Sequence, residues 1–255
     1  VVGDDGEQDE TRSQDTTTGW PVHEVGRNAD TFDPEAGRLL AANSSVVSNS
    51  VHLHSNGRDT RSHLEIAWKF HPEGYEPKLK RAARSLGDGL NIDIRPEEAD
   101  QKLHAYTVLQ THQKLTTFEP HLHAPGQRMC LEAIWGINRF TLNCVGYDHN
   151  WVRVYKYEDD AAPLLPKGTI LHLTGYFNNT LTNPNVADPR NWSGSGHRSV
   201  DNMFINLLQA IYMDDEEFAA EVAKREQLLR LTGGVDIGCL VCGANEAQAN
   251  AGGAQ

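Results

Sequence analysis

The sequence contains no hydrophobic run long enough to cross a membrane, and aromatic residues make up only 7% of its 255 positions. Because a membrane-spanning helix needs about 20 consecutive apolar residues, we expect no transmembrane segment. Basic residues are also few, since 23 Lys and Arg stand against 35 Asp and Glu and give a net charge of −12. Nucleic-acid binding depends on clustered positive charge, so this composition argues against a nucleic-acid partner.

Cysteine is scarce, and its four residues fall into two pairs. Cys130 and Cys144 flank a predicted hairpin, so a cross-strand disulfide is geometrically feasible. Cys239 and Cys242 form a Cys-x-x-Cys, but no second cysteine pair or following histidine completes a zinc ribbon or a haem attachment site. Two interpretations stay open for this pair: a disulfide, or a contact with something outside the chain. The even cysteine count favours an exported location, periplasmic or extracellular.

From residue 20 onward, short apolar runs are interrupted by Gly, Pro and Asn, a pattern typical of all-β proteins. Their spacing favours antiparallel sandwiches over βαβ units. We expect strands at 45–53, 63–70, 105–111, 115–123, 129–134, 139–145, 152–157, 169–177 and 203–211. We therefore expect five parts in the chain: an extended acidic arm at 1–19, an N-terminal partial sandwich at 20–87, a second sandwich at 88–213, a helix at 214–232 and a loose tail at 233–255. Since the chain starts at Val1 without an initiator methionine or a signal sequence, we expect a processed form or a fragment.

His121 and His123 lie two positions apart in a predicted strand, so their side chains point to the same face with Cα atoms about 6.5 Å apart. Two imidazoles in this arrangement can bind one metal ion. Met203 follows eighty residues later, and a thioether ligand favours Cu(I) over zinc. The alternative is that the His-x-His arises by chance and that Met203 fills the core.

Seven stretches carry a resemblance to a known family, and they occur in the order and spacing of that family. They are Pro34-Glu-Ala-Gly-Arg-Leu-Leu40, Val51-His-Leu-His-Ser-Asn-Gly57, Phe118-Glu-Pro-His-Leu-His-Ala-Pro-Gly126, Tyr147-Asp-His-Asn-Trp151, Leu165-Pro-Lys-Gly-Thr169, Tyr176-Phe-Asn-Asn179 and Ser199-Val-Asp-Asn-Met203. Through them, residues from about 19 to 213 resemble the copper type II, ascorbate-dependent monooxygenases. This family includes the peptidylglycine α-hydroxylating and dopamine β-monooxygenases, and the chain is most similar to its bacterial homologues.

The resemblance implies two jelly-roll-like β-sandwich domains that each carry one copper, with His121, His123 and Met203 binding the copper of the second domain. For the first domain it implies His52 as one ligand. The other two ligands of the family come from an adjacent His-His pair upstream, which this sequence lacks, and His54 is a nearby candidate to substitute.

Two further histidines are candidates to lie beside the second copper without binding it. His172 alternates with two leucines, and His197 follows a flexible Gly-Ser-Gly. Peptidylglycine, the substrate of the family's peptide-amidating member, is a poor candidate substrate for this chain. The arginine with which that member binds the substrate carboxylate is replaced by Glu119, and the Asn and Tyr that assist this arginine are replaced by Ile205 and Leu207.

Two functions follow as expectations. The resemblance implies O₂ activation and C–H hydroxylation of a small molecule at the His₂Met copper, with ascorbate or a similar reductant. The alternative is a catalytically inactive copper-binding or structural subunit, which would dock onto other protein subunits through the N-terminal arm and the C-terminal tail.

Overall fold

The computed structural model describes residues 25–31, 35–37, 40, 42–43, 57–61, 63–88, 92–192, 194–196, 198–233 and 238–242. Within these ranges the elements are, in chain order, β1 Lys80–Asp88, β2 Gln101–Val108, β3 His112–Phe118, β4 Pro120–Leu122, β5 Gly126–Trp135, β6 Asn138–Gly146, β7 Tyr155–Lys156, β8 Leu164–Leu165, β9 Ile170–Phe177, β10 Phe204–Met213 and α1 Asp215–Thr232. No helix in the described part of the chain is long and apolar enough to span a bilayer.

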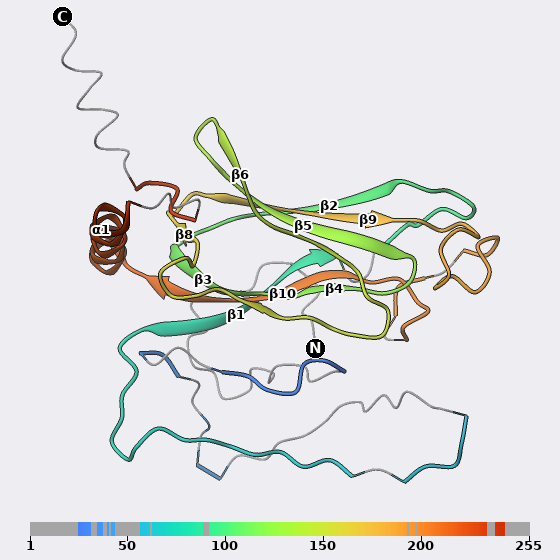
Figure 1. Ribbon diagram of the computed structural model, residues 1–255, viewed down its shortest axis with the longest axis horizontal. Helices are drawn as coiled ribbons and strands as arrows, with labels where there is room; N and C mark the ends of the chain where they lie inside the picture. Colours follow the sequence, from blue (N-terminus) through green and yellow to red (C-terminus); the bar gives the residue numbers. More distant parts are fainter. Residues whose placement is uncertain are drawn as a thin grey trace, which may run out of the picture.

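The strands form two antiparallel sheets that pack face to face (Figure 1). One sheet has the order β1-β10-β3-β7, with β4 also paired to β10 and β8 to β3, and the other has the order β2-β9-β5-β6. The predicted all-β antiparallel sandwich with a C-terminal helix is therefore confirmed.

Side-chain alternation places the core between the two sheets. In β9, Leu171 and Leu173 are fully buried, and in the facing sheet Phe118, Leu122 and Phe204 are buried as well. Successive residues of a strand point to opposite faces, so the residues between them lie on the outer faces of the sandwich. This alternation decides on which side each histidine lies.

Helix α1 begins where the sequence predicts it. Asp214 is the N-cap and accepts a hydrogen bond from the Glu217 amide, while the Glu217 side chain accepts one from the Asp214 amide. Such a capping box satisfies two of the amides that a helix start leaves without partners. Gly233 ends the helix in the left-handed conformation, and Phe218 packs the helix against the end of β10.

The expected strand at 63–70 is wrong. Its apolar side chains alternate as in a strand, but Leu64, Ile66 and Phe70 are 50–70% exposed and the segment carries no strand pairing. Figure 1 shows this part of the chain as an extended trace that runs apart from the two layers. The expected strand at 45–53 lies outside the described residues. The described residues before β1 form no sheet of their own, so the N-terminal sandwich stays a prediction.

Strand β1 was not predicted. It pairs with β10 along its whole length, from Lys80 opposite Tyr212 to Asp88 opposite Phe204. The sheet that carries the candidate site thus reaches back to Lys80, upstream of the expected domain boundary at 87/88.

Both cysteine pairs form disulfides. Cys130 and Cys144 lie directly opposite each other on β5 and β6, as predicted for a cross-strand bridge. Cys239 and Cys242 are bonded to each other, which decides between the two interpretations of the Cys-x-x-Cys. Two disulfides are compatible with an exported protein.

Candidate metal centre

Strand β4 positions the two histidines of the His-x-His. It pairs with the start of β10, with Leu122 opposite Phe204 and His121 opposite Ile205. Leu122 and Phe204 belong to the core between the sheets. By alternation, His121 and His123 point to the outer face of the β1-β10-β3 sheet, and yet each is only 8% exposed.

The two imidazoles converge on each other. The Nε2 atoms of His121 and His123 lie 3.1 Å apart, and the ring planes are inclined by 63°. If both nitrogens bound one ion at about 2.05 Å, a separation of 3.1 Å would give an angle of about 98° at the metal. This angle lies between those of square and tetrahedral coordination, so the separation is compatible with both imidazoles binding one ion. The same separation also suits a hydrogen bond in which one ring donates to the other.

Met203 follows from the strand register. Continuing the pairing of Phe204 with Leu122 by one residue would place Met203 opposite His123. Directly opposed residues of an antiparallel pair have Cβ atoms about 4.5–5.5 Å apart and point to the same face. If the pairing continues in this way, the partly buried Met203 side chain would lie on the side of the sheet where the two imidazoles lie.

The loop before Met203 is fastened to the chain after His123. The Ala124 amide donates to the Ser199 carbonyl at 3.1 Å, and the Asn202 amide donates to the Gly194 carbonyl at 2.9 Å. The first bond holds the loop at the end of β4, and the second connects two residues within the loop. They restrict the freedom of the methionine relative to the histidines.

Asp201 adds a negative charge to this loop. Two Arg198 nitrogens bond its carboxylate, at 2.6 and 3.0 Å. Hydrogen bonding from Arg198 lowers the pKa of Asp201, and the nearby His123 ring lowers it further when charged. A Cβ at Gly196 would lie 2.3 Å from the Asp201 carboxylate, so the turn needs glycine there. Asp201 is thus held ionised within electrostatic reach of His123.

Glu119 lies two residues before His121, on the same face of the sheet. It is fully buried and forms an ion pair with Arg27, which also bonds Asp30 at 3.0 Å. Arg27 belongs to the segment 25–31, which lies on the outer side of the β1-β10-β3 sheet (Figure 1). The repulsion that we expected from Glu119 toward a carboxylate substrate is therefore balanced by a cation from a distant segment.

A small cavity of about 30 Å³ lies beside His121, between β4 and the segment that follows β6. Tyr147, Trp151 and Val152 line its other side. Since one water needs about 10–15 Å³ by this measure, the cavity has room for about two water-sized molecules. The backbone at Gly26 lies in close contact with the same segment, because a Cβ at this position would lie 2.4 Å from the Val152 carbonyl oxygen.

The other histidines predicted for metal sites are not brought to this centre. His172 lies on β9 next to the core residues Leu171 and Leu173, so its ring points to the outer face of the opposite sheet. The core of the sandwich separates it from His121, and the expected position beside the metal does not hold. His52, His54 and His197 lie outside the described residues.

No group of three or more His, Cys, Asp or Glu side chains is placed to hold a metal among the residues that the structure describes. The candidate centre brings two imidazoles together, and Met203 stays the expected third ligand. No local pattern in the sequence indicates Arg27 or the electrostatic role of Asp201, because both depend on loops that fold back onto β4.

The comparisons with known proteins add no assignment: no protein-family model matches the chain, and no curated protein matches its sequence.

Proposed function

We propose that this chain is an exported copper-binding protein of the monooxygenase type, with His121, His123 and Met203 as the copper ligands. The observation that carries the proposal is the 3.1 Å separation of the two Nε2 atoms. Extending the β4–β10 register by one residue would bring Met203 to the same face, which supports it as the third ligand. The motifs that resemble the copper monooxygenases support the same three residues. Bound there, copper would supply one-electron chemistry for activating O₂ toward a C–H bond, with ascorbate or a similar reductant as the electron source.

The protein's own residues give this site its character. Burial of both rings excludes most water, and the strand pairing of β4 with β10 fixes the directions from which the ligands approach. A neutral thioether stabilises the reduced ion, because soft ligands prefer Cu(I). Asp201 contributes a nearby negative charge that offsets part of the cost of a buried cation.

The size of the cavity favours a second candidate function. Sites for organic ligands usually enclose about 300–1,000 Å³, whereas the cavity beside His121 encloses about 30 Å³. This cavity is lined by His121 but not by His123 or Met203, and its size suits a diatomic gas or water better than an organic substrate. The second candidate is therefore a copper-binding subunit that performs no hydroxylation and acts within a larger assembly.

Replacing Met203 with leucine tests the ligand set. Met203→Leu keeps the volume and removes the sulfur, so we expect Cu(I) affinity to fall at least about tenfold and the copper–sulfur signal in X-ray absorption to disappear. Met213→Leu is the matched control, because Met213 is a buried methionine at the other end of β10. Equal Cu(I) affinity in the two variants would remove Met203 from the ligand set.

The two candidate functions differ in turnover. Ascorbate-dependent O₂ consumption that increases with a C–H substrate, and that disappears in His121→Gln, supports the monooxygenase. Tight copper binding that depends on His121 and His123, without such consumption, supports the binding subunit.

A further inference from the structure

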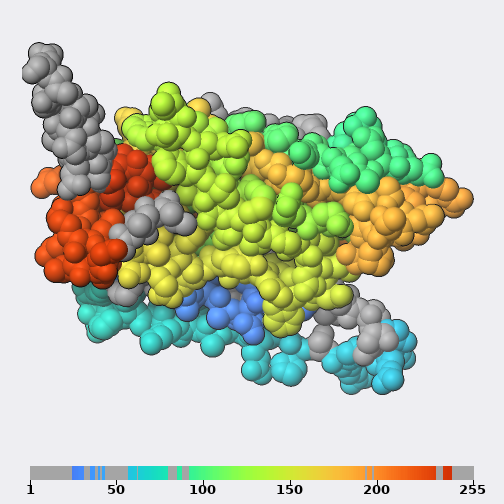
Figure 2. All heavy atoms as spheres, turned by 45° about the horizontal axis from the view of Figure 1, so that its top comes forward, coloured from blue at the N-terminus to red at the C-terminus, as the bar shows by residue number. Residues whose placement is uncertain are grey.

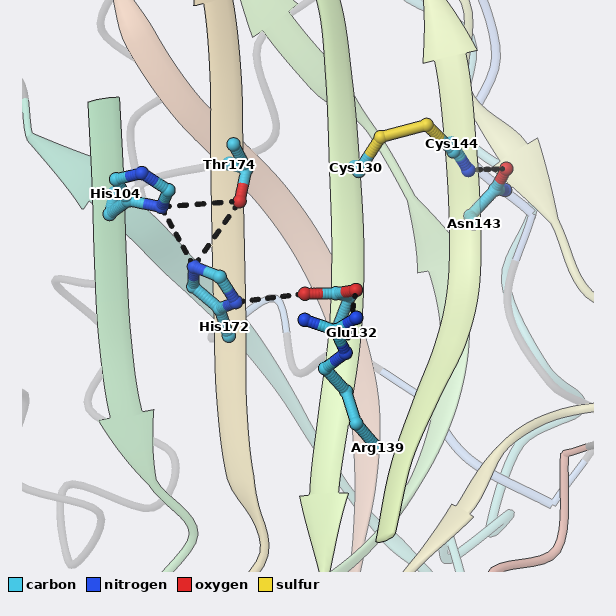
Figure 3. Close-up of a disulfide and its surroundings, with 8 residues drawn as sticks. All are labelled: His104, Cys130, Glu132, Arg139, Asn143, Cys144, His172 and Thr174. Atoms are coloured by element: carbon cyan, nitrogen blue, oxygen red, sulfur yellow. Dashed lines mark hydrogen bonds and ion pairs between the residues drawn. A yellow bond between two sulfur atoms is a disulfide. The ribbon is translucent and has the colours of Figure 1, made fainter. Parts of the chain in front are cut away.

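A second histidine pair lies on the outer face of the β2-β9-β5-β6 sheet. The register sets His172 of β9 opposite Tyr106 of β2 on one side and Glu132 of β5 on the other, and it sets His104 opposite Thr174. In Figure 3 the side chains of His104, Thr174, His172 and Glu132 stand together on adjacent strands beside the Cys130–Cys144 disulfide. Figure 2 turns this face of the sandwich toward the viewer, and β2, β5 and β6 are visible on the surface.

Hydrogen bonds fix the orientation of the His172 ring. Its Nδ1 lies 2.9 Å from a carboxylate oxygen of Glu132, whose other oxygen is 3.5 Å from Arg139. A carboxylate can only accept, so Nδ1 of His172 carries the proton and Nε2 of the neutral ring presents a lone pair. Tyr106 stacks on the same ring with its centroid 4.3 Å away, which leaves the imidazole little freedom to rotate.

That lone pair points at a second imidazole nitrogen. Nε2 of His172 lies 2.9 Å from Nδ1 of His104, and the Thr174 hydroxyl lies 3.2 Å from the former and 3.4 Å from the latter. Two nitrogens 2.9 Å apart would enclose an angle of about 90° at an ion bound at about 2.05 Å. This is the angle between neighbouring ligands in tetragonal coordination, the geometry of Cu(II) and Ni(II).

The surroundings match a divalent ion. A ligating histidine commonly donates its second N–H to a carboxylate, which fixes the tautomer and increases the basicity of the ligand, and Glu132 stands in this position. His104 is exposed, so water can complete the coordination.

We propose that His104 and His172 form a second metal site, which takes a divalent first-row ion of the Cu(II) type through Nδ1 of His104 and Nε2 of His172. The Thr174 hydroxyl is a further oxygen ligand, and Glu132 is a positioning residue for His172. This inference goes beyond the proposed function and does not depend on it, because the core of the sandwich separates this site from His121 and His123.

This site is tested by titrating the full chain, in a His121→Gln/His123→Gln background, with Cu(II). Calorimetry and electron paramagnetic resonance monitor the binding. We expect His104→Gln and His172→Gln each to remove the same single equivalent of Cu(II), and the two together to remove no more. Glu132→Gln should weaken binding of this equivalent by about 10–100-fold, the usual effect of losing such a carboxylate.

The matched control is His112→Gln. Its ring also pairs with a carboxylate, Asp215, at 3.1 Å, and stacks on Phe218. This variant should bind Cu(II) like its parent. Because His104 is exposed, His104→Gln tests the site even where a change at the buried His172 impairs folding.

An unchanged number of Cu(II) ions with unchanged affinity in His104→Gln would overturn the second site. Losses that add up in the double variant would also overturn it, since the two residues would then bind separate ions. Neither outcome affects the proposal for His121, His123 and Met203, which is tested separately by Cu(I) binding to the Met203→Leu variant.

Discussion

Replacing Arg27 with methionine would leave a buried carboxylate without its cation. The Arg27 and Glu119 side chains are only 3% and 0% exposed, and Glu119 lies two residues before the candidate ligand His121. Methionine retains an apolar chain in the space of the arginine stem and removes the charge. Removing one partner of a buried ion pair costs about 3–5 kcal/mol, because the remaining charge loses the attraction of that partner.

This cost is large relative to the stability of a domain. Typical free energies of unfolding are about 5–15 kcal/mol, so a loss of about 3–5 kcal/mol is a substantial share. At about 2–4 °C per kcal/mol for a domain of this size, the melting temperature should fall by about 6–20 °C. The double variant Arg27→Met/Glu119→Leu removes both charges, and we expect it to recover most of the loss, as buried pairs replaced by apolar residues usually do.

Urea unfolding measures the free energy of unfolding. The fluorescence emission of Trp151 shows whether the segment that carries Arg27 stays in place. A Cβ at the neighbouring Gly26 would lie 2.8 Å from the Trp151 ring, so the segment and the tryptophan are in close contact. If the segment detaches to let water reach Glu119, Trp151 emission should shift before the sheets unfold. A Trp151→Phe variant identifies that signal among the five tryptophans.

One result would refute this reasoning. If Arg27→Met changes the free energy of unfolding by less than about 1 kcal/mol, the pair behaves like an exposed salt bridge. Unchanged Trp151 emission in the same variant would show that Arg27 does not hold the segment against the sheet.

Three further outcomes are expected. Because Arg198 lowers the pKa of Asp201, this carboxylate stabilises the folded state above its unfolded pKa of about 3.9, and the contribution is lost as the pH falls through the lower folded value. Asp201→Asn should therefore reduce the difference in urea stability between pH 7 and acid, and an identical pH profile would contradict this. Asp214→Ala removes the capping box with Glu217 and should cost about 1 kcal/mol in thermal unfolding, whereas an unaltered melting temperature would show that the cap is not used. Burial raises the pKa of Tyr157 to about 12, so the folded state should lose stability between about pH 10 and 12 as the unfolded chain ionises; Tyr157→Phe should lose less, as followed by phenolate absorbance and circular dichroism.

The alternation of apolar and polar residues was sufficient to predict the central strands, but it gave a wrong prediction where no partner strand was available. Leu171 and Leu173 follow period two and lie in the core, and β9 forms close to where it was expected. Leu64 and Ile66 follow the same period and are 70% and 50% exposed. A strand needs a pairing partner as well as a pattern, and one sequence does not show which segments pair. For the same reason β1 was missed, since it is defined by its pairing with β10.

Those residues of the candidate centre that lie close together in the sequence could be predicted. His121 and His123 are two residues apart, so strand geometry alone places them together. The pairing of Arg27 with Glu119 spans 92 positions, and the contact of His104 with His172 spans 68. Such contacts depend on register and loop placement, which no local pattern encodes.

The two proposed sites differ in the exposure of one ligand, because His172 is 8% exposed like His121 and His123, whereas His104 is exposed to solvent. This difference affects which ion each site would prefer. The cost of moving an ion out of water rises with the square of its charge, so a buried site penalises a divalent ion far more than a monovalent one. His121 and His123 are both 8% exposed and lie near a thioether, which favours Cu(I) on both grounds. His104 is exposed, and its partner His172 is bonded to the Glu132 carboxylate, which suits a hydrated divalent ion. One sandwich would thus present a reduced-copper site on one outer face and an oxidised-copper site on the other.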